Sequence, residues 1–438
     1  MISPVKFKKI LNDIKRRPED AALDLGISIK EIEEYLKGAK KIPFSLITKA
    51  VKIWSINYSE FFDIEDDTHN GFKKMSKNES EKTKRIMTRD GKPYYLYKDT
   101  AYSRLSPFKP EWIEELLVVD DNSPENKNIV FNNGHFLHQF TYFVGSVNFY
   151  YILNGIKKVA IMNTGDSMYI SPYIPHSFAT RKNIRNKNGV ILALTYSDKL
   201  NHDSIDELSA IGKDLSLKFK LDLENKLKSF KSNLIYYLKV SSFSLDELSN
   251  RLNDKSLLNI LNINKLPNFE MIDRIANALN INLRDLIPIH NEDQVKVLES
   301  SNCKKWFYPS TNEPVYTMVE LAGVKKLPIS RAFELHVNID ENIYSKASII
   351  ETPLHQYIYN IGKNTCYIIL ENKKVELNSN DSIYLKPNLI HSFKGKGSKL
   401  LILRTGGKIS GDALYHFSLI SNKELSRAID DNKPWFDY

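Results

Sequence analysis

The sequence predicts an α+β protein in which a helical module followed by an antiparallel β-barrel occurs twice in tandem. The first observation is an internal repeat: residues 165–178 read GDSMYISPYIPHSF and residues 380–393 read NDSIYLKPNLIHSF. The second is a helical pattern upstream of each copy, at 43–62 and again at 267–287. A chain of 438 residues is also too long for a single compact core, so several domains are expected.

Each helical module contains signals for helix ends. Ser28 is followed by Glu31 and Ser244 by Glu247, which is the spacing of a capping box at a helix N-terminus. Apolar residues then recur at helical spacing, and Gly26 separates two short helices of the first module. This density of short helices resembles a helix-turn-helix module of the repressor type.

The β segments lie at about 85–200 and 305–405 and consist of short runs rich in Tyr, Phe, Val and Ile. Turn dipeptides separate the runs of the first segment, at Asp90-Gly91, Asn154-Gly155 and Gly165-Asp166. Many short strands with such turns predict an antiparallel barrel or jelly roll. The expected domains are a helical module at 1–66, a β-barrel at 67–200, a helical linker at 201–225, a second helical module at 226–292 and a second β-barrel at 293–438.

The composition limits the function classes. Hydrophobic residues make up 42% of the chain and charged residues 26%, which is ordinary for a globular protein. No apolar run approaches the roughly 18 residues of a membrane helix, and the N-terminal segment lacks the apolar stretch of a signal peptide. Cys303 and Cys366 lie far apart, which predicts a reducing, cytoplasmic environment. The net charge of +9 is compatible with nucleic acid or with an anionic small substrate.

Polar residues of the first β-barrel have the spacing of a metal site. His135 and Gln139 belong to the segment NNGHFLHQF, and His176 follows in PYIPHSF. A cupin barrel binds metal in this way, with a histidine and a residue a few positions on from one strand, and a histidine from a later strand. Inward-facing imidazole groups suit Fe, Ni, Cu or Zn. The alternative for each histidine is a packed, hydrogen-bonded core residue, but three candidate ligands at this spacing favour a metal site.

The second β-barrel is expected to be a degenerate copy. It keeps His355 and His391. If His355 corresponds to His135, the position of Gln139 is occupied by Tyr359, which is not an ordinary ligand. Two histidines without a third ligand make a weak site, so the sequence predicts one metal ion per chain.

The alternation of helix-turn-helix and cupin modules resembles the phosphonate-processing non-haem iron enzymes. This family includes hydroxypropylphosphonic acid epoxidase, hydroxyethylphosphonate dioxygenase and methylphosphonate synthase, and the tandem doubling is similar to the last two. The resemblance covers essentially the whole chain. The specific matches are NNGH at 132–135, TRDGKPYYLY at 88–97 and GDSMYISPYIPHS at 165–177.

The resemblance implies an iron(II) site with an unusual ligand. The usual facial triad has two histidines and a carboxylate, which lies four residues after the first histidine in the epoxidase and six before the second in the dioxygenase. Here those positions are Gln139 and Ile170. This double departure is similar to the methylphosphonate synthases, and it implies iron held by His135, Gln139 and His176. His138 is the competing third ligand, ranked lower because its side chain is expected on a different face from His135.

The same resemblance implies the substrate contacts. Arg89, Tyr97 and Asn132 fall where the family binds the phosphonate, and Thr195 falls near a residue that contacts the substrate hydroxyl group. Lys15 falls where the related dioxygenase has a lysine that enters the active site from a neighbouring subunit. We therefore expect Lys15 and Tyr97 to act in catalysis, within a homodimer or homotetramer that shares its active sites. The alternatives are a surface turn for Arg89, a core position for Tyr97 and a solvated basic helix end for Lys15.

The implied reaction is Fe(II)- and O₂-dependent cleavage of the C–C bond of 2-hydroxyethylphosphonate to methylphosphonate and CO₂ or bicarbonate, without external reductant. One alternative is dioxygenase activity that yields hydroxymethylphosphonate and formate. Another is a transcription regulator with a ligand-sensing cupin. A DNA-reading helix should be basic, yet the segment 28–38 holds three glutamates and two lysines. We expect an enzyme that binds neither nucleic acid nor a membrane.

Overall fold

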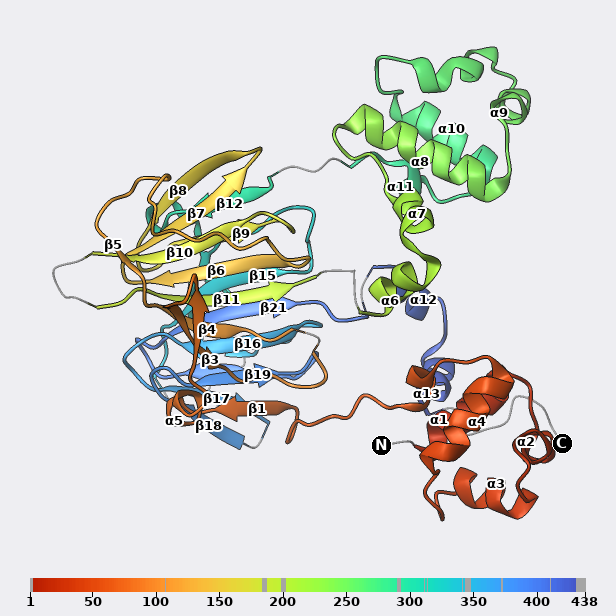
Figure 1. Ribbon diagram of the computed structural model, residues 1–438, viewed down its shortest axis with the longest axis horizontal. Coiled ribbons are helices and arrows are strands. Elements are labelled where there is room, and N and C mark those ends of the chain that lie inside the picture. Colours follow the sequence, from red (N-terminus) through yellow and green to blue (C-terminus); the bar gives the residue numbers. More distant parts are fainter. Residues whose placement is uncertain are drawn as a thin grey trace.

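The computed structural model describes residues 3–430 except 107, 183–186, 198–201, 290–292, 311, 313, 341, 343–347, 372 and 410. It is a mixed α/β fold with several sheets, in which two helical lobes lie on one side of a stack of β-sheets (Figure 1). Within the described residues, no helix is long and apolar enough to cross a membrane.

The first helical lobe forms the helix ends that its sequence predicts. Its elements are α1 (Pro4–Asp13), α2 (Pro18–Leu25), α3 (Ile29–Leu36), α4 (Phe44–Trp54) and the 3₁₀ helix η1 (Tyr58–Phe61). Ser28 Oγ accepts from the Glu31 amide at 3.2 Å, and Glu31 returns a contact to the Ser28 amide, so the expected capping box forms. Gly26 ends α2 in the left-handed conformation at φ 60°, which permits the sharp turn into α3.

The second helical lobe repeats this arrangement with a weaker cap. Its elements are α8 (Lys226–Ser241), α9 (Leu245–Leu252), η3 (Lys255–Asn262), α10 (Phe269–Leu279) and α11 (Leu283–Leu286). Ser244 Oγ accepts from the Glu247 amide at 3.1 Å. The Glu247 carboxylate instead accepts from Arg251 Nε at 2.7 Å, so the reciprocal half of the expected capping box is replaced by an ion pair one turn further on.

The remaining helices connect the lobes. The segment after the first set of strands is helical as expected, with α6 (His202–Ile211), α7 (Lys213–Ser216) and η2 (Leu217–Phe219). The last helices are α12 (Asp412–Ser418) and α13 (Asn422–Asp430). Lys9 Nζ donates to the carbonyl oxygens of Ala428 and Ile429, so α13 packs against the first helical lobe.

The first β lobe, defined as β2 to β11, holds two facing sheets. A seven-stranded sheet has the order β12-β9-β6-β11-β4-β3-β2, and a four-stranded sheet has the order β5-β10-β7-β8. Phe143 and Ile191 of the first sheet and Phe149 and Phe178 of the second share one core. The strands are β2 (Arg85–Arg89), β3 (Lys92–Asp99), β4 (Glu111–Glu115), β5 (Val118–Val119), β6 (His138–Val144), β7 (Val147–Leu153), β8 (Ile156–Met162), β9 (Ser167–Ile170), β10 (His176–Arg181) and β11 (Val190–Tyr196).

The second β lobe, defined as β13 to β21, has the same plan. Its seven-stranded sheet has the order β1-β19-β16-β21-β15-β14-β13 and faces the three-stranded sheet β18-β17-β20. The strands are β13 (Lys305–Tyr308), β14 (Tyr316–Glu320), β15 (Arg331–Val337), β16 (His355–Asn360), β17 (Cys366–Leu370), β18 (Lys373–Leu377), β19 (Ser382–Leu385), β20 (Ser392–Lys394) and β21 (Lys399–Thr405).

The two β lobes exchange edge strands. The strand β1 (Phe72–Met75), which is followed by α5 (Lys77–Glu81), precedes the first β lobe in sequence but pairs with β19 of the second. The strand β12 (Val295–Leu298), which is followed by η4 (Ser300–Asn302), precedes the second β lobe but pairs with β9 of the first. The expected domain boundaries at 67 and 293 therefore place β1 in the domain of the first β lobe and β12 in the domain of the second, although each strand completes a sheet of the other lobe.

The repeated Asp-Ser pair explains how this exchange is held. Asp166 accepts from the Ser300 amide at 2.8 Å, and Asp381 accepts from the Lys77 amide at 2.8 Å. Ser167 Oγ accepts from the Ala322 amide at 2.9 Å, and its counterpart Ser382 Oγ accepts from the Ala101 amide at 2.9 Å. The sequence repeat thus includes residues that join one β lobe to the other.

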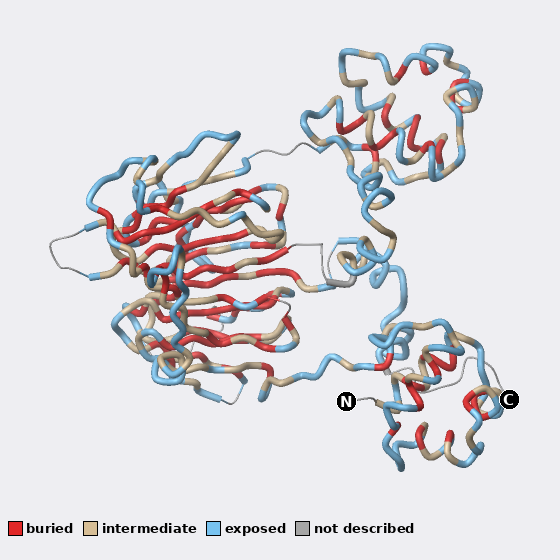
Figure 2. Tube along the Cα trace, in the orientation of Figure 1, coloured by how far each residue is buried: buried red, intermediate tan, exposed pale blue. Residues whose placement is uncertain are grey.

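Tyrosine and leucine side chains of both seven-stranded sheets form a shared core between the β lobes. Tyr142, Tyr169 and Leu194 pack in one cluster with Tyr357 and Leu401. Buried residues run along the strands of both β lobes in Figure 2, and the cluster contains residues of both. The two β lobes consequently form one rigid support for the site described next.

Candidate metal and substrate site

His135 and Gln139 meet at the start of β6. Gly134 has φ 72°, and a Cβ there would lie 2.6 Å from the Tyr173 backbone, so glycine permits the close approach that positions His135. His135 Nδ1 donates to the Leu137 carbonyl oxygen at 2.7 Å, because a carbonyl can only accept. His135 Nε2 therefore presents a lone pair, and it lies 2.9 Å from Gln139 Oε1.

The Gln139 amide is held in the matching orientation. Its Nε2 donates to Thr141 Oγ1 at 2.9 Å, which leaves Oε1 directed at His135. With the His135 tautomer fixed by the Leu137 carbonyl, two acceptor atoms face each other at hydrogen-bond distance. A cation between them, or a proton on His135, is needed to make this arrangement favourable.

His176 completes the group from the opposite sheet. It begins β10, and its Nδ1 donates to the Ile174 carbonyl oxygen at 2.8 Å, which again leaves Nε2 unprotonated. The His176 and His135 rings meet edge to face with centroids 5.2 Å apart. Burial lowers the pKa of His176 to about 4, so the imidazole is neutral at physiological pH and ready to bind a metal ion.

The donor set fits a divalent transition metal. Within the described residues no group of three or more His, Cys, Asp or Glu side chains converges, so a third protein ligand beside the two imidazoles has to come from another residue type. Gln139 Oε1 supplies that donor in the geometry above. Two imidazole nitrogens and one amide oxygen suit the borderline ions, iron(II) among them.

His138 is held away from this role by a pairing that recurs in the other β lobe. Its Nδ1 lies 2.7 Å from the Tyr169 hydroxyl, and the two rings stack with centroids 5.7 Å apart. His355 makes the same contacts with Tyr384, at 2.6 Å and 5.9 Å. Since this pair is present in both β lobes, the structure favours a packing role for His138.

The strand register changes the expected correspondence between the two halves. Gln139 pairs with Ile170, and Gln356 pairs with Leu385, the residue equivalent to Ile170 in the sequence repeat. Gln356 is therefore the counterpart of Gln139, and His355 is the counterpart of His138. The assumed equivalence of His355 with His135, and of Tyr359 with Gln139, is wrong because His355 matches the second of two nearby histidines, His138, which lies three residues after His135.

The second β lobe lacks the first histidine and contains a cation instead. The Tyr173 amide donates to the His135 carbonyl, and the equivalent Asn388 amide donates to Thr352, so Thr352 stands where His135 would be. Arg404 Nε donates to Gln356 Oε1 at 3.0 Å, at the register position that Thr195 occupies beside Gln139. A guanidinium at this point opposes metal binding.

Arg89 on β2 and Tyr97 on β3 lie at the other side of the seven-stranded sheet from β6, and only Arg89 reaches a residue next to a candidate ligand, Ser177. A bulge between Met87 and Thr88 re-aims Arg89, whose Nη1 donates to Ser177 Oγ at 3.2 Å and to the Val130 carbonyl. Its guanidinium lowers the pKa of the neighbouring His176. Burial raises the pKa of Tyr97 to about 12, so its hydroxyl stays protonated.

Asn132 touches the candidate ligands directly, and Thr195 lies beside them. Asn132 Nδ2 donates to His176 Nε2 at 3.1 Å, and its Oδ1 accepts from the His176 amide at 2.8 Å. Thr195 lies opposite Gln139 in the register of β6 and β11. Lys15 is not brought to this group: it follows α1 in the exposed part of the first helical lobe, which Figure 1 shows set apart from β6 and β10.

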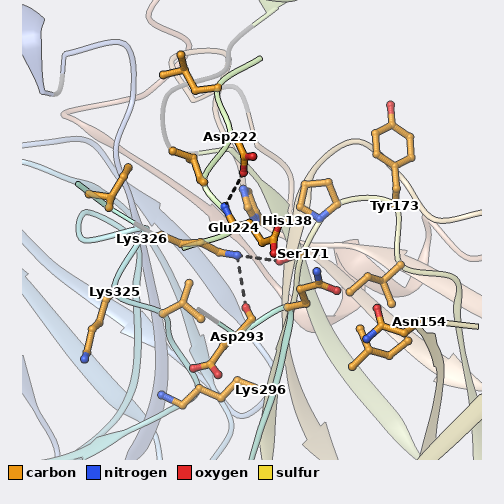
Figure 3. A pocket seen from close by; sticks show the side chains of 18 of the residues that line it. His138, Asn154, Ser171, Tyr173, Asp222, Glu224, Asp293, Lys296, Lys325 and Lys326 are labelled. Atoms are coloured by element: carbon orange, nitrogen blue, oxygen red, sulfur yellow. Dashed lines mark hydrogen bonds between the residues drawn. The ribbon is translucent and has the colours of Figure 1, made fainter. Parts of the chain in front are cut away.

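Figure 3 shows an open cleft of about 1980 Å³, which is not lined by His135, Gln139 or His176 but whose wall residue Tyr173 donates its amide to the His135 carbonyl. His138 and Tyr173 line one wall, and residues 219–224 of the linker and Lys326 of the second half line the others. Lys326 Nζ donates to Ser171 Oγ at 2.9 Å. Five lysines and three acidic residues line the cleft, so its charge favours an anion: Lys220, Lys226, Lys296, Lys325 and Lys326, with Asp222, Glu224 and Asp293.

Two residues near the site were missed by the sequence analysis. Lys326 comes from the other half of the chain, and no local motif marks it. Glu115 is fully buried on β4, and the positive charge of Arg89 acts on its carboxyl group. The sequence pattern could have identified Glu115, because it lies two residues after Ile113 in an alternating strand and so shares the inward face on which Ile113 is buried.

Comparison with known proteins gives a consistent result. No protein-family model matches the chain. It is 46% identical over 439 aligned residues to the methylphosphonate synthase of Nitrosopumilus maritimus (strain SCM1), an alignment that covers 98% of this chain and 94% of that protein.

Solved structures have the same fold. The HEPD of Streptomyces albus with its substrate 2-hydroxyethylphosphonate and Fe(II) bound is 30% identical, with a TM-score of 0.91 over 99% of this chain and 98% of that one. Native PhpD with cadmium atoms has a TM-score of 0.73 at 16% identity, over 98% of this chain and 99% of that one, and is similar in fold. With nearly half of its residues identical over almost its whole length to a methylphosphonate synthase, the chain belongs to the methylphosphonate synthase family.

Proposed function

We propose that the protein is a non-haem iron(II) oxygenase that cleaves the C–C bond of 2-hydroxyethylphosphonate to give methylphosphonate and bicarbonate or CO₂. The observation that carries the proposal is the convergence of His135 Nε2, Gln139 Oε1 and His176 Nε2, a neutral donor set, in a member of the methylphosphonate synthase family. One 2-hydroxyethylphosphonate dianion and one O₂ balance methylphosphonate, bicarbonate and a proton, so no external reductant is required.

Iron(II), when bound, supplies the activation of O₂ and the one-electron chemistry of bond cleavage. His135, Gln139 and His176 would hold it. The neutral ligands leave the full charge of the metal ion to act on a dianionic substrate. Ile170, buried and paired in register with Gln139, presents no carboxylate to this group, in agreement with a glutamine in the ligand set.

The other side chains bind and orient the phosphonate. Arg89 offers a guanidinium, the group best suited to two oxygens of a phosphonate. The protonated Tyr97 hydroxyl and the Asn132 amide can donate to the remaining oxygens, and Thr195 lies where a substrate hydroxyl would meet Gln139. Each of these groups is neutral or cationic, so none repels the substrate.

We infer that Lys15 reaches the site of a partner chain. In its own chain Lys15 is exposed, and its Nζ lies 3.5 Å from the Asp13 carbonyl oxygen, a weak local contact. The cleft lined by His138 and Tyr173 is open to solvent. A homodimer or homotetramer with shared active sites, built from tandem helix-turn-helix and cupin modules, accounts for both observations. The free thiols Cys303 and Cys366 suit a reducing cytoplasm.

The test is anaerobic reconstitution with Fe(II), followed by 2-hydroxyethylphosphonate and O₂, with phosphorus NMR of the products. Methylphosphonate with stoichiometric bicarbonate is expected. Hydroxymethylphosphonate with formate would instead assign the dioxygenase reaction, which the likeness to Streptomyces albus HEPD makes the second candidate. A regulator is disfavoured because Lys37 and Lys40 of the first helical lobe are paired with Glu33 and Glu31. DNA binding in a gel shift, without turnover, would overturn the enzyme proposal.

A further inference from the structure

A carboxyl group is buried without partners inside the first β lobe. Glu115, the last residue of β4, has a relative exposure of 0%, and neither side-chain oxygen has a hydrogen-bond partner. In the part of the chain that the structure describes, these two oxygens are the buried side-chain polar atoms left unsatisfied. A buried carboxylate ion without partners is strongly disfavoured, so this environment favours the neutral acid.

Glu115 lies beside the candidate phosphonate site. It pairs in register with Tyr95, and Tyr95 carries the Arg89 guanidinium 4.7 Å from its ring centroid. Burial raises the pKa of Glu115 well above its usual value, and the positive charge of Arg89 opposes this shift. The pKa of Glu115 therefore depends on whether the positive charge of Arg89 is neutralised by another anion.

The second β lobe shows that the fold does not need this acid. Tyr95 and Tyr316 are counterparts, because their hydroxyls accept from the amides of the equivalent residues Phe178 and Phe393. Tyr316 pairs in register with Val337, which is 1% exposed. A valine thus fills the position of Glu115 in the half whose first ligand position is Thr352. The acid occurs together with the candidate site.

We propose that Glu115 is a positioning residue of the phosphonate site that couples substrate binding to proton uptake. As the neutral acid it leaves the charge of Arg89 available to the phosphonate. As the carboxylate it becomes the internal counter-ion of Arg89 and competes with the substrate. This inference rests on the proposed function, because it takes the ligand of Arg89 to be a phosphonate.

Few other groups near Glu115 change charge at moderate pH. Arg89 of β2 lies against the ring of Tyr95. Burial raises the pKa of Tyr95 well above its usual value and that of Tyr97 to about 12, so both hydroxyls of β3 stay neutral. Glu114, on the same strand, accepts from Asn188 Nδ2 at 2.9 Å. The neighbouring β10 contributes the Thr180 hydroxyl, which donates to the Glu115 carbonyl.

The experiment is anaerobic calorimetry of 2-hydroxyethylphosphonate binding to the Fe(II)-loaded protein, in buffers of different ionisation enthalpy and over a range of pH. Without O₂ the complex does not turn over. At a pH above the pKa of Glu115, the wild type is expected to take up one proton more on binding substrate than Glu115→Gln does. In that pH range the Kd of the wild type for the substrate should rise about tenfold per pH unit. In Glu115→Gln both effects should vanish. Glu114→Gln, one residue away and partly exposed, is the matched control and should keep both effects, displaced to lower pH because the charge of Glu114 raises the pKa of Glu115.

The outcomes separate this inference from the function. Binding with the same proton uptake and pH profile in the wild type and Glu115→Gln would overturn the inference alone. So would infrared difference spectra in which the Glu115 carboxyl band does not change from ionised to protonated when 2-hydroxyethylphosphonate binds at a pH above the pKa of Glu115. Absence of any phosphonate binding by the wild type would overturn both proposals. If Glu115→Gln does not fold, Glu115→Met also lacks the acid and should show the same flat profile.

Discussion

Replacing Gln139 with alanine removes the amide oxygen that faces His135 Nε2 at 2.9 Å. Three protein donors become two. Disturbing the residues around a metal ion weakens metal affinity or activity by roughly 10–100-fold, and loss of a ligand should reach at least the lower end of that range. This corresponds to about 1.4–2.8 kcal/mol of binding free energy. Because Gln139 is only 4% exposed, water is a poor replacement for the lost oxygen.

The assay is anaerobic competition for Fe(II) against a chelator of known affinity, with turnover measured on the same samples. Gln356→Ala is the matched control, since Gln356 has the equivalent register position in the second β lobe and accepts from Arg404. That variant should keep the iron affinity of the wild type. Unchanged iron affinity and turnover in Gln139→Ala would refute the ligand assignment, and His138 would then have to be the third ligand.

The remaining predictions concern the other half, the partner chain and the buried acid. Metal analysis should find one iron per chain, unchanged in His391→Ala; two tightly held equivalents, one lost in that variant, would contradict this. Lys15→Ala should cut turnover at least tenfold with fold and iron content intact, and mixing it with inactive His176→Ala should restore part of the activity through hybrid dimers. Normal turnover would make Lys15 a surface charge, and failure of mixing would place its action in its own chain. Glu115→Met should raise Tm, and increasingly so with pH: folding raises the pKa of Glu115 well above its ordinary value of 4.5, so wild-type stability falls as pH rises from that value towards the pKa of the folded protein. A Tm difference between Glu115→Met and the wild type that is independent of pH would show that Glu115 does not titrate.

The repeat and the local ends of helices could be predicted from the sequence because they depend on neighbouring residues. The Ser28 cap, the Gly26 turn and the spacing of His135 and Gln139 are local, and the structure brings His135, Gln139 and His176 together. The exchange of β1 and β12 could not be predicted, since strand pairing over such separations is determined by tertiary contacts.

The correspondence between the halves failed for a similar reason. The first half has two histidines three residues apart and the second half keeps only the later one, so matching His355 with His135 instead of His138 gave the wrong partner. Strand register, which depends on pairing with β19, identifies Gln356 as the counterpart of Gln139. Glu115 was overlooked because an acid in a strand is usually at the solvent face, and only its neighbours show that it points inward.

The exchange of β1 and β12 has the geometry of a strand-swapped dimer whose two subunits are joined by residues 201–225. Joining them turns a second-order assembly into an intramolecular one, so the stability of the pair no longer depends on protein concentration. Either half expressed alone would expose an unpaired sheet edge, at β9 or at β19, and would tend to aggregate or to pair with a second copy of itself. The second half thus completes the sheet that carries the candidate metal site through the strand it donates, whether or not it can hold a metal ion.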